Sequence, residues 1–134
     1  MDEYQGLVDA ATSVRSHAYA PYSCFQVGAA LLGESGRVYA GCNVENVSYG
    51  LSSCAERNAV FRAVGDGERR FTAIVVVTAA ATPTPPCGAC RQVLSEFAAS
   101  GDMDVVMVTT GGTGKTRRLS VLLPESFSSF ERGH

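Results

Sequence analysis

Residues 72–78 restrict the fold more than any other stretch, because apolar and β-branched side chains follow one another there without polar alternation. A strand of this composition must be buried on both faces, which happens in sheets that helices cover on either side. A second buried strand is expected at residues 105–109, and a helical pattern at residues 87–99 lies between the two. The sequence therefore predicts an α/β fold.

Hydrophobic spacing and turn residues place the other elements. They are expected as a helix at 4–20 ended by Pro21, strands at 27–32 and 37–42 joined by a turn at 33–36, a polar connection at 43–53, a helix at 54–64 ended by Gly65–Gly67, a stiff proline loop at 82–86, a turn at 111–114, a short strand at 117–119 and a short helix at 120–125. This order predicts one domain over residues 1–134, a three-layer αβα sandwich with a mixed five-stranded sheet.

Composition and charge exclude several classes of function. The net charge is −2, and the eleven basic residues are scattered apart from pairs at 69–70 and 117–118, so no basic stripe could follow a nucleic-acid backbone. The acidic start at residues 2–3 does not resemble a signal peptide, and the longest apolar run, 73–81, is too short for a membrane span. Five cysteines, an odd number, argue against a secreted disulfide framework and favour a cytoplasmic protein.

Two helix starts carry the residues suited to chemistry. Cys54 and Glu56 open the helix expected at 54–64, and Cys87 and Cys90 form a C-x-x-C step at the start of the next helix. Three thiolates fill three of the four tetrahedral positions around zinc, and a catalytic zinc keeps the fourth for water. Glu56 is the natural group to move the protons of that water. This pattern predicts a catalytic zinc site.

Each of these residues also has a plainer interpretation. Cys87 and Cys90 alone could form a redox pair. A structural zinc would need a fourth protein ligand, for which the candidates are His17, Cys24, Cys42 and His134. Cys24 and Cys42 are otherwise expected to be small buried residues. Glu56 could equally be part of a capping box with Ser53, and the residues alone leave this alternative open.

The stretch Gly111–Thr116 looks at first like a phosphate-binding loop. That motif requires a glycine five places before Gly114, where this chain has Thr109. Pro124 also leaves no room for the long helix that such a loop caps. A surface turn is the better interpretation, and we assign no role to residues 111–118.

A family resemblance covers nearly the whole chain. It is carried, in this order, by Tyr19–Ser23, Phe25–Ala30, Gly41–Asn46, Cys54–Arg57, Pro86–Val93 and Leu122–Phe127. Together these stretches resemble the short, three-cysteine, homotetrameric cytidine deaminases. The resemblance implies a fold of the cytidine deaminase kind and one Zn²⁺ per chain.

The resemblance also implies roles for individual residues. Cys54, Cys87 and Cys90 would hold the zinc, whose activated water attacks C4 of the pyrimidine. Glu56 would take a proton from that water, pass it to N3 and help ammonia to leave, which favours the catalytic interpretation of this carboxylate. The resemblance further implies that the Ala55 amide contacts the base and that Arg57 hydrogen-bonds the cysteine sulfurs.

Further substrate contacts follow from the same resemblance. Asn43 and Glu45, two apart on an extended segment, would grip the ribose 3′-hydroxyl, although a polar strand end would look the same. Phe25 would pack on the pyrimidine ring, where a core aromatic is the alternative. Tyr49 and Phe127 resemble residues that active sites of the homotetramer borrow from neighbouring subunits, which would explain why Phe127 and Phe130 lie in a serine-rich tail.

These inferences predict a cytoplasmic zinc hydrolase that converts cytidine and deoxycytidine to uridine and deoxyuridine in pyrimidine salvage. Three rivals are a deaminase of RNA or DNA cytosine, a deaminase of a cytosine-containing antibiotic, and a zinc protein without activity. The scattered basic residues argue against the first, and the Asn43–Glu45 pair argues against the first and the second. Assay of a Glu56→Ala variant separates the third from an enzyme.

Overall fold

The computed structural model describes residues 2–129 and contains a mixed five-stranded sheet, as the sequence predicted. The strands are β1 (Gly28–Gly33), β2 (Val38–Cys42), β3 (Phe71–Thr78), β4 (Asp104–Thr109) and β5 (Gly114–Arg118). The helices are α1 (Gln5–Arg15), α2 (Ala55–Gly65), α3 (Gly88–Phe97) and α4 (Leu119–Leu122), with short 3-10 turns at η1 (Asp2–Tyr4), η2 (Tyr49–Leu51) and η3 (Ala99–Gly101).

The sheet has the order β2-β1-β3-β4-β5, with the apolar strand β3 at its centre. β1 lies antiparallel to both β2 and β3, whereas β3 and β4 are parallel and β5 returns antiparallel to β4. Side chains of β3 are buried at all but one position, which agrees with the uninterrupted apolar run in the sequence. The one parallel pair is joined through α3, the crossover that this geometry requires.

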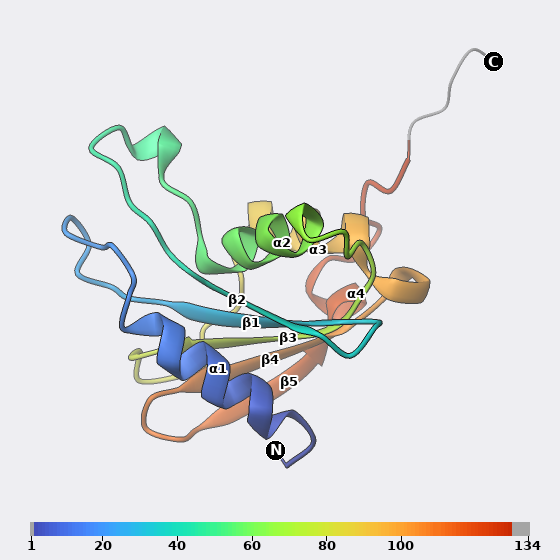
Figure 1. The fold of residues 1–134 in the computed structure, drawn as a ribbon, viewed down its shortest axis with the longest axis horizontal. Helices are drawn as coiled ribbons and strands as arrows, with labels where there is room; N and C mark the ends of the chain where they lie inside the picture. Colours follow the sequence, from blue (N-terminus) through green and yellow to red (C-terminus); the bar gives the residue numbers. More distant parts are fainter. Residues whose placement is uncertain (1, 130–134) are drawn as a thin grey trace.

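Helices cover both faces of the sheet and make three layers (Figure 1). On one face α1 packs through Leu7 and Ala11 against alternate residues of the central strands. On the other face α2 and α3 pack over the remaining alternate residues. Gly41 is required where α2 crosses β2, because a Cβ atom there would lie 2.5 Å from the backbone nitrogen of Ala59.

Three boundaries differ from the sequence prediction. The first helix ends at Arg15, well before Pro21, because the Tyr19 N–H donates to the Asn43 carbonyl at 3.0 Å and draws the chain into an extended bridge. β5 begins at Gly114, and its residues are all exposed, so no apolar pattern marked this edge strand. The last helix covers Leu119–Leu122 and ends earlier than expected.

The glycine-rich stretch before β5 is a surface turn, as predicted. The Gly112 N–H donates to the Thr109 carbonyl at 3.0 Å, and the following residues enter β5 directly, with no helix start at that point. Over residues 2–129, no helix has the length and apolar character needed to cross a membrane.

Candidate active site

Two helices begin at the same corner of the molecule. Cys54 is the N-cap of α2 and Cys87 is the N-cap of α3, and both have extended backbone angles that aim the chain into the helix. Cys90 lies within the first turn of α3, on the face shared with Cys87. The sulfur atoms of Cys54, Cys87 and Cys90 therefore converge, and all lie within 4.8 Å of one another.

This cluster has the dimensions and chemistry of a zinc site. Thiolates at a Zn–S distance of about 2.3 Å in a tetrahedron are about 3.8 Å apart, and the sulfurs of Cys54 and Cys87 are separated by 3.9 Å. The Arg57 guanidinium donates to the Cys54 sulfur at 3.2 Å. A hydrogen bond from Cys90, followed by that from Arg57, lowers the pKa of the Cys54 thiol to about 5, which favours the thiolate that metals bind.

The two plainer interpretations of the cysteines fit this geometry poorly. A redox pair would need only Cys87 and Cys90, whereas a third sulfur shares their corner. A structural zinc would need a fourth ligand, but within residues 2–129 the cluster of metal-binding side chains contains the three cysteines and neither His17, Cys24 nor Cys42. His134 lies outside the described residues. Three sulfurs thus leave one tetrahedral position for a non-protein ligand.

Glu56 lies beside the sulfur cluster and is only 5% exposed. The capping box does not form, because the N-cap is Cys54 and the Ser53 hydroxyl donates instead to the Asn58 side-chain oxygen at 2.7 Å. Burial, and next the charge of Cys54, raise the pKa of the Glu56 carboxyl to about 7. A carboxyl group with this pKa can both accept and release a proton near neutral pH.

A cavity of about 260 Å³ opens above Glu56. Its lining includes these residues: Ser23, Phe25, Val27, Asn43, Glu45, Cys54, Ala55, Glu56, Val76, Thr78, Thr84 and Pro85. The four residues predicted to contact the substrate, Phe25, Asn43, Glu45 and Ala55, all lie on this wall. Phe25 is 38% exposed, which excludes the alternative of a core aromatic.

Asn43 and Glu45 line the cavity and also hydrogen-bond the chain at residues 22–27. The Asn43 amide accepts from the Val27 N–H and donates to the Phe25 carbonyl, both at 2.8 Å. One oxygen of Glu45 accepts from the backbone N–H groups of Tyr22 and Ser23 at 3.0 and 3.1 Å, and the other accepts from the Ser23 hydroxyl. These donors, led by the hydroxyl, lower the pKa of the Glu45 carboxyl, which is therefore ionised at neutral pH.

Most of the chain matches known proteins whose zinc-binding family agrees with this site. The family model described as "Cytidine and deoxycytidylate deaminase zinc-binding region" matches residues 1–109. The chain belongs to this deaminase family. It is 46% identical to a cytidine deaminase of Sporosarcina psychrophila, over 94% of this chain and 92% of that one. It is 47% identical to a cytidine deaminase of Halalkalibacterium halodurans, over 93% and 94% of the two chains.

Solved structures of the family have the same fold. A crystal structure of a cytidine deaminase from Burkholderia pseudomallei superposes with a TM-score of 0.88, at 47% identity and over 92% of this chain and 98% of that one. The family is zinc-binding, and the corner formed by Cys54, Cys87 and Cys90 is the place in this deaminase where a metal ion fits.

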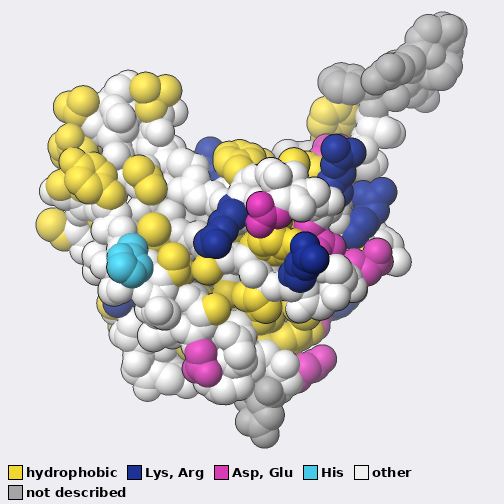
Figure 2. Space-filling view, viewed as in Figure 1, with side chains coloured by type: hydrophobic (Ala, Val, Ile, Leu, Met, Phe, Trp, Pro, Cys, Tyr) yellow, Lys and Arg dark blue, Asp and Glu magenta, His cyan; other side chains and the backbone are white. Residues whose placement is uncertain are grey.

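Two residues expected at the site lie away from the cavity of this deaminase. Tyr49 is 79% exposed on the arm, the connection of residues 43–53 that contains η2, and it lines a neighbouring cavity of about 320 Å³ with Glu45. Phe127 is 58% exposed, and its backbone carbonyl accepts from the Gln92 side chain. Figure 2 shows many of the exposed hydrophobic side chains gathered on the arm and on the adjoining loop of residues 19–25. Phe130 lies outside the described residues.

Sequence reasoning missed some of the residues that build the site. Asn58 donates to the Cys42 carbonyl at 2.7 Å and accepts from Ser53, so it joins the end of β2 to the residue before Cys54. Its position one turn into α2 was the available signal.

Cys24, expected to be buried, is exposed with φ of 59°, because the neighbouring Ser23 and Phe25 take the cavity-facing positions.

Proposed function

We propose that this chain is a zinc-dependent cytidine deaminase that hydrolyses cytidine and deoxycytidine to uridine and deoxyuridine with release of ammonia. The observation that carries the proposal is the buried Glu56 carboxyl, which lies beside three converging sulfurs at the wall of a nucleoside-sized cavity. Membership of the deaminase family supports the same reaction.

In this proposal Cys54, Cys87 and Cys90 hold one zinc ion. The chemistry that zinc supplies when bound is a water that can be deprotonated near neutral pH. Glu56 accepts the proton released from the attacking water and donates it to N3 of the pyrimidine. It then carries the second proton to the departing amino group, so that one water and one cytidine give one uridine and one ammonia.

The remaining residues of the cavity orient the substrate. Phe25 packs on the pyrimidine ring, and the Ala55 N–H at the start of α2 donates to the base. Asn43 and Glu45 hold the sugar 3′-hydroxyl. Asn43 uses one amide hydrogen on the Phe25 carbonyl and has a second for the sugar. A carboxylate has lone pairs beyond those that already accept hydrogen bonds, so Glu45 can also accept from the hydroxyl.

The charge around the cavity favours a free nucleoside. Glu45 is ionised on its wall, and none of the described residues that line the cavity is a lysine or arginine. A polynucleotide or a nucleotide phosphate would therefore find no cationic partner at this opening. The five cysteines are free thiols, which fits a cytoplasmic enzyme of pyrimidine salvage.

The proposed assembly is a homotetramer with shared active sites. Tyr49 and Phe127 are large exposed aromatic residues, and the exposed side chains of Val47 and Leu51 extend the surface around Tyr49. Apolar groups gathered in this way are typical of a surface that a partner covers. Each subunit would receive Tyr49 and Phe127 side chains from its neighbours beside its own cavity.

A spectrophotometric assay tests the function directly. Zinc-loaded protein is expected to consume cytidine and deoxycytidine, followed as the loss of cytosine absorbance, and to leave cytidine 5′-monophosphate almost untouched. Removal of zinc with a chelator should abolish turnover, and zinc should restore it. Failure of the zinc-loaded protein to release ammonia from either nucleoside would contradict the proposal, and preference for the monophosphate would contradict the assigned substrate class.

A further inference from the structure

Arg91 follows Cys90 directly in α3 and joins two segments that are far apart in the sequence. Its Nε atom donates at 2.8 Å to the carbonyl of Pro86, the residue before Cys87. Its Nη1 atom donates, also at 2.8 Å, to the carbonyl of Leu122 at the end of α4. One guanidinium thus contacts both the loop that delivers a metal-site sulfur and the end of the last helix.

Gln92, the next residue, holds the segment that follows α4. Its side-chain amide donates to the Phe127 carbonyl at 2.8 Å. Residues 126–129 have no regular secondary structure, so side-chain contacts of this kind determine where they lie. Adjacent residues of α3 therefore hold the chain on either side of Pro124.

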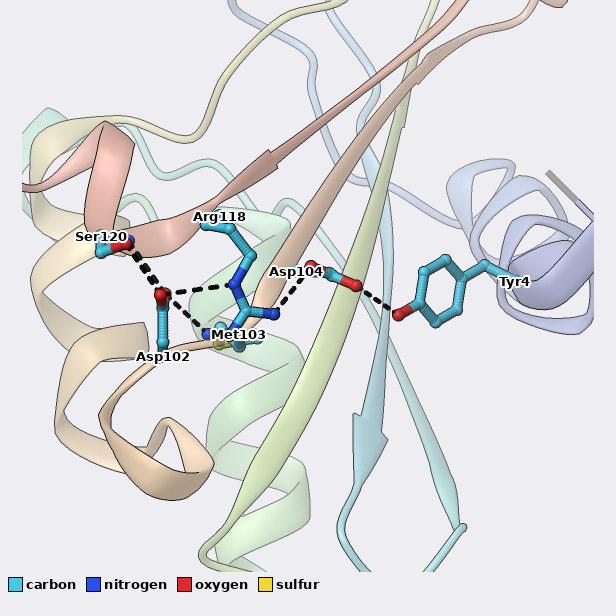
Figure 3. A network of polar contacts seen from close by, with 6 residues as sticks. All are labelled: Tyr4, Asp102, Met103, Asp104, Arg118 and Ser120. Atoms are coloured by element: carbon cyan, nitrogen blue, oxygen red, sulfur yellow. Dashed lines mark hydrogen bonds and ion pairs between the residues drawn. The ribbon is translucent and has the colours of Figure 1, made fainter.

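The start of α4 is anchored separately, at the network shown in Figure 3. Asp102 accepts from the Ser120 N–H and hydroxyl at 3.0 and 2.8 Å. Arg118 bridges Asp102 and Asp104, and Asp104 also accepts from the Tyr4 hydroxyl at 2.6 Å. The network thus fixes the start of α4, and Arg91 fixes its end.

We propose that Arg91 and Gln92 are positioning residues that couple the metal corner to the C-terminal segment. Arg91 fixes the Pro86–Cys87 peptide and the end of α4 together, and Gln92 fixes the backbone of Phe127. The inference rests on the proposed function, because it takes Cys87 as a zinc ligand and Phe127 as a substrate-site residue of a neighbouring subunit.

Arginine suits the first role for a geometric reason. The guanidinium is planar and presents several N–H groups in a fixed fork, so separate atoms of it can donate to two carbonyls at once. The ammonium of lysine is a single point on a flexible stem and cannot reproduce that fork. Charge alone is therefore not sufficient for the role.

The experiment uses full-length zinc-loaded protein and measures zinc release and kinetics separately. Arg91→Gln should release zinc to a chelator about tenfold faster than the unmodified chain, because the loop before Cys87 is no longer held. Arg91→Lys should release it nearly as fast. Gln92→Met, of similar shape, should raise KM for cytidine about fivefold, the cost of one neutral hydrogen bond, with kcat and zinc release unchanged.

Matched controls lie elsewhere on the surface. Arg62→Gln changes an exposed arginine of α2 that donates to the Ala40 carbonyl at 3.4 Å, and Gln5→Met changes an exposed glutamine of α1 that donates to Asp9. Both should match the unmodified chain in zinc release, KM and kcat. Circular dichroism of each variant identifies loss of fold. The role of Arg91 and the role of Gln92 are tested by different variants.

The outcomes separate this inference from the proposed function. If the unmodified chain deaminates cytidine but Arg91→Gln releases zinc no faster, the role of Arg91 is wrong. Full rescue by Arg91→Lys would also overturn the bridging role. An unchanged KM in Gln92→Met would overturn the role of Gln92. A fall in kcat that matches a loss of bound zinc in this variant would overturn it too. If the unmodified chain has no activity, the proposed function fails while zinc release still tests Arg91.

Discussion

Glu56 and Glu45 are carboxyl groups on the wall of the same cavity, yet their surroundings are opposite. Glu56 is buried, and burial with the nearby Cys54 charge raises its pKa to about 7. Glu45 is half-buried and accepts from two backbone N–H groups and a hydroxyl, which lower its pKa. Glu56 has a single donor, its own backbone N–H, and burial outweighs it, so this carboxyl can exchange a proton near neutral pH. Glu45, with several donors, is held in its charged form.

The contrast extends to the segments that carry the two residues. Glu56 lies in the first turn of α2, where the helix backbone sets its direction and its side chain is almost fully buried. Glu45 and Asn43 lie on an irregular connection, and they hold the loop of residues 22–27 through the side chains that we propose contact the sugar. Loss of Glu56 should thus affect the chemical step more than substrate binding, while changes at Glu45 or Asn43 should affect binding and local structure together.

The largest expected effect is that of Glu56→Gln on turnover. Glutamine keeps the shape of the side chain but cannot accept and return a proton, so kcat should fall about a thousandfold, within the range for general acid–base catalysis. Zinc content should stay close to that of the unmodified chain. Steady-state kinetics with parallel metal analysis checks this, and a loss of zinc in the variant would mean that Glu56 supports the metal rather than the proton transfer.

The second effect is expected in how the folding stability of the metal-free, reduced protein depends on pH. The native pKa of Glu56 lies above its ordinary value of 4.5, so the native state binds more protons than the unfolded state between about pH 4.5 and 7. The contribution of Glu56 to the stability of the fold should therefore fall as pH rises through that window, by up to about 3 kcal/mol. Glu56→Gln removes this loss.

Urea denaturation at about pH 5 and about pH 8 measures that difference. The variant should gain stability relative to the unmodified chain as pH rises, because glutamine imposes no cost of burying a charge. The cysteine thiols are present in both proteins, so the difference reports Glu56 together with its interaction with the Cys54 charge. An advantage of the variant that stays the same at both pH values would show that the carboxyl is not held in its neutral form.

The metal corner and the central strands could be read from the sequence for a common reason. β3 is one uninterrupted apolar run, and Cys54, Cys87 and Cys90 stand at helix starts, so local patterns determined where each lies. The capping box was uncertain because it depends on a single residue. The N-cap is Cys54 and not Ser53, and propensity cannot resolve a shift of one position.

Other features had no local signal. β5 is an exposed edge strand that forms because its backbone pairs with β4, and its side chains show no apolar alternation. The early end of α1 at Arg15 depends on a bridge to Val44, which lies far along the chain. The same is true of the contacts from Asn43 to Phe25 and Val27, since long-range hydrogen bonds leave no periodic trace in a sequence.

The next largest effect is expected at Asn43, which we propose both binds the sugar and stabilises the neighbouring loop. Asn43→Ala removes hydrogen bonds to the Phe25 carbonyl and the Val27 N–H, which should cost about 2 kcal/mol of unfolding free energy. KM for cytidine should rise about tenfold, because Phe25 and the sugar contact are disturbed together, with a smaller fall in kcat. Thermal denaturation and kinetics check this. A higher KM with unchanged stability would mean that Asn43 acts on the substrate alone.

The smallest effect is expected at Phe127, which lies outside the cavity of its own chain. Phe127→Ala should raise KM for cytidine about fivefold with little change in kcat, because one apolar contact of a neighbouring site is lost. Co-assembly of Phe127→Ala with Glu56→Ala chains provides the decisive comparison. A cavity with an intact Glu56 then receives an intact Phe127 from the other variant, so part of the activity should regain the KM of the unmodified chain. If Phe127 acted within its own subunit, every competent cavity would lack it, and no mixture would recover that KM.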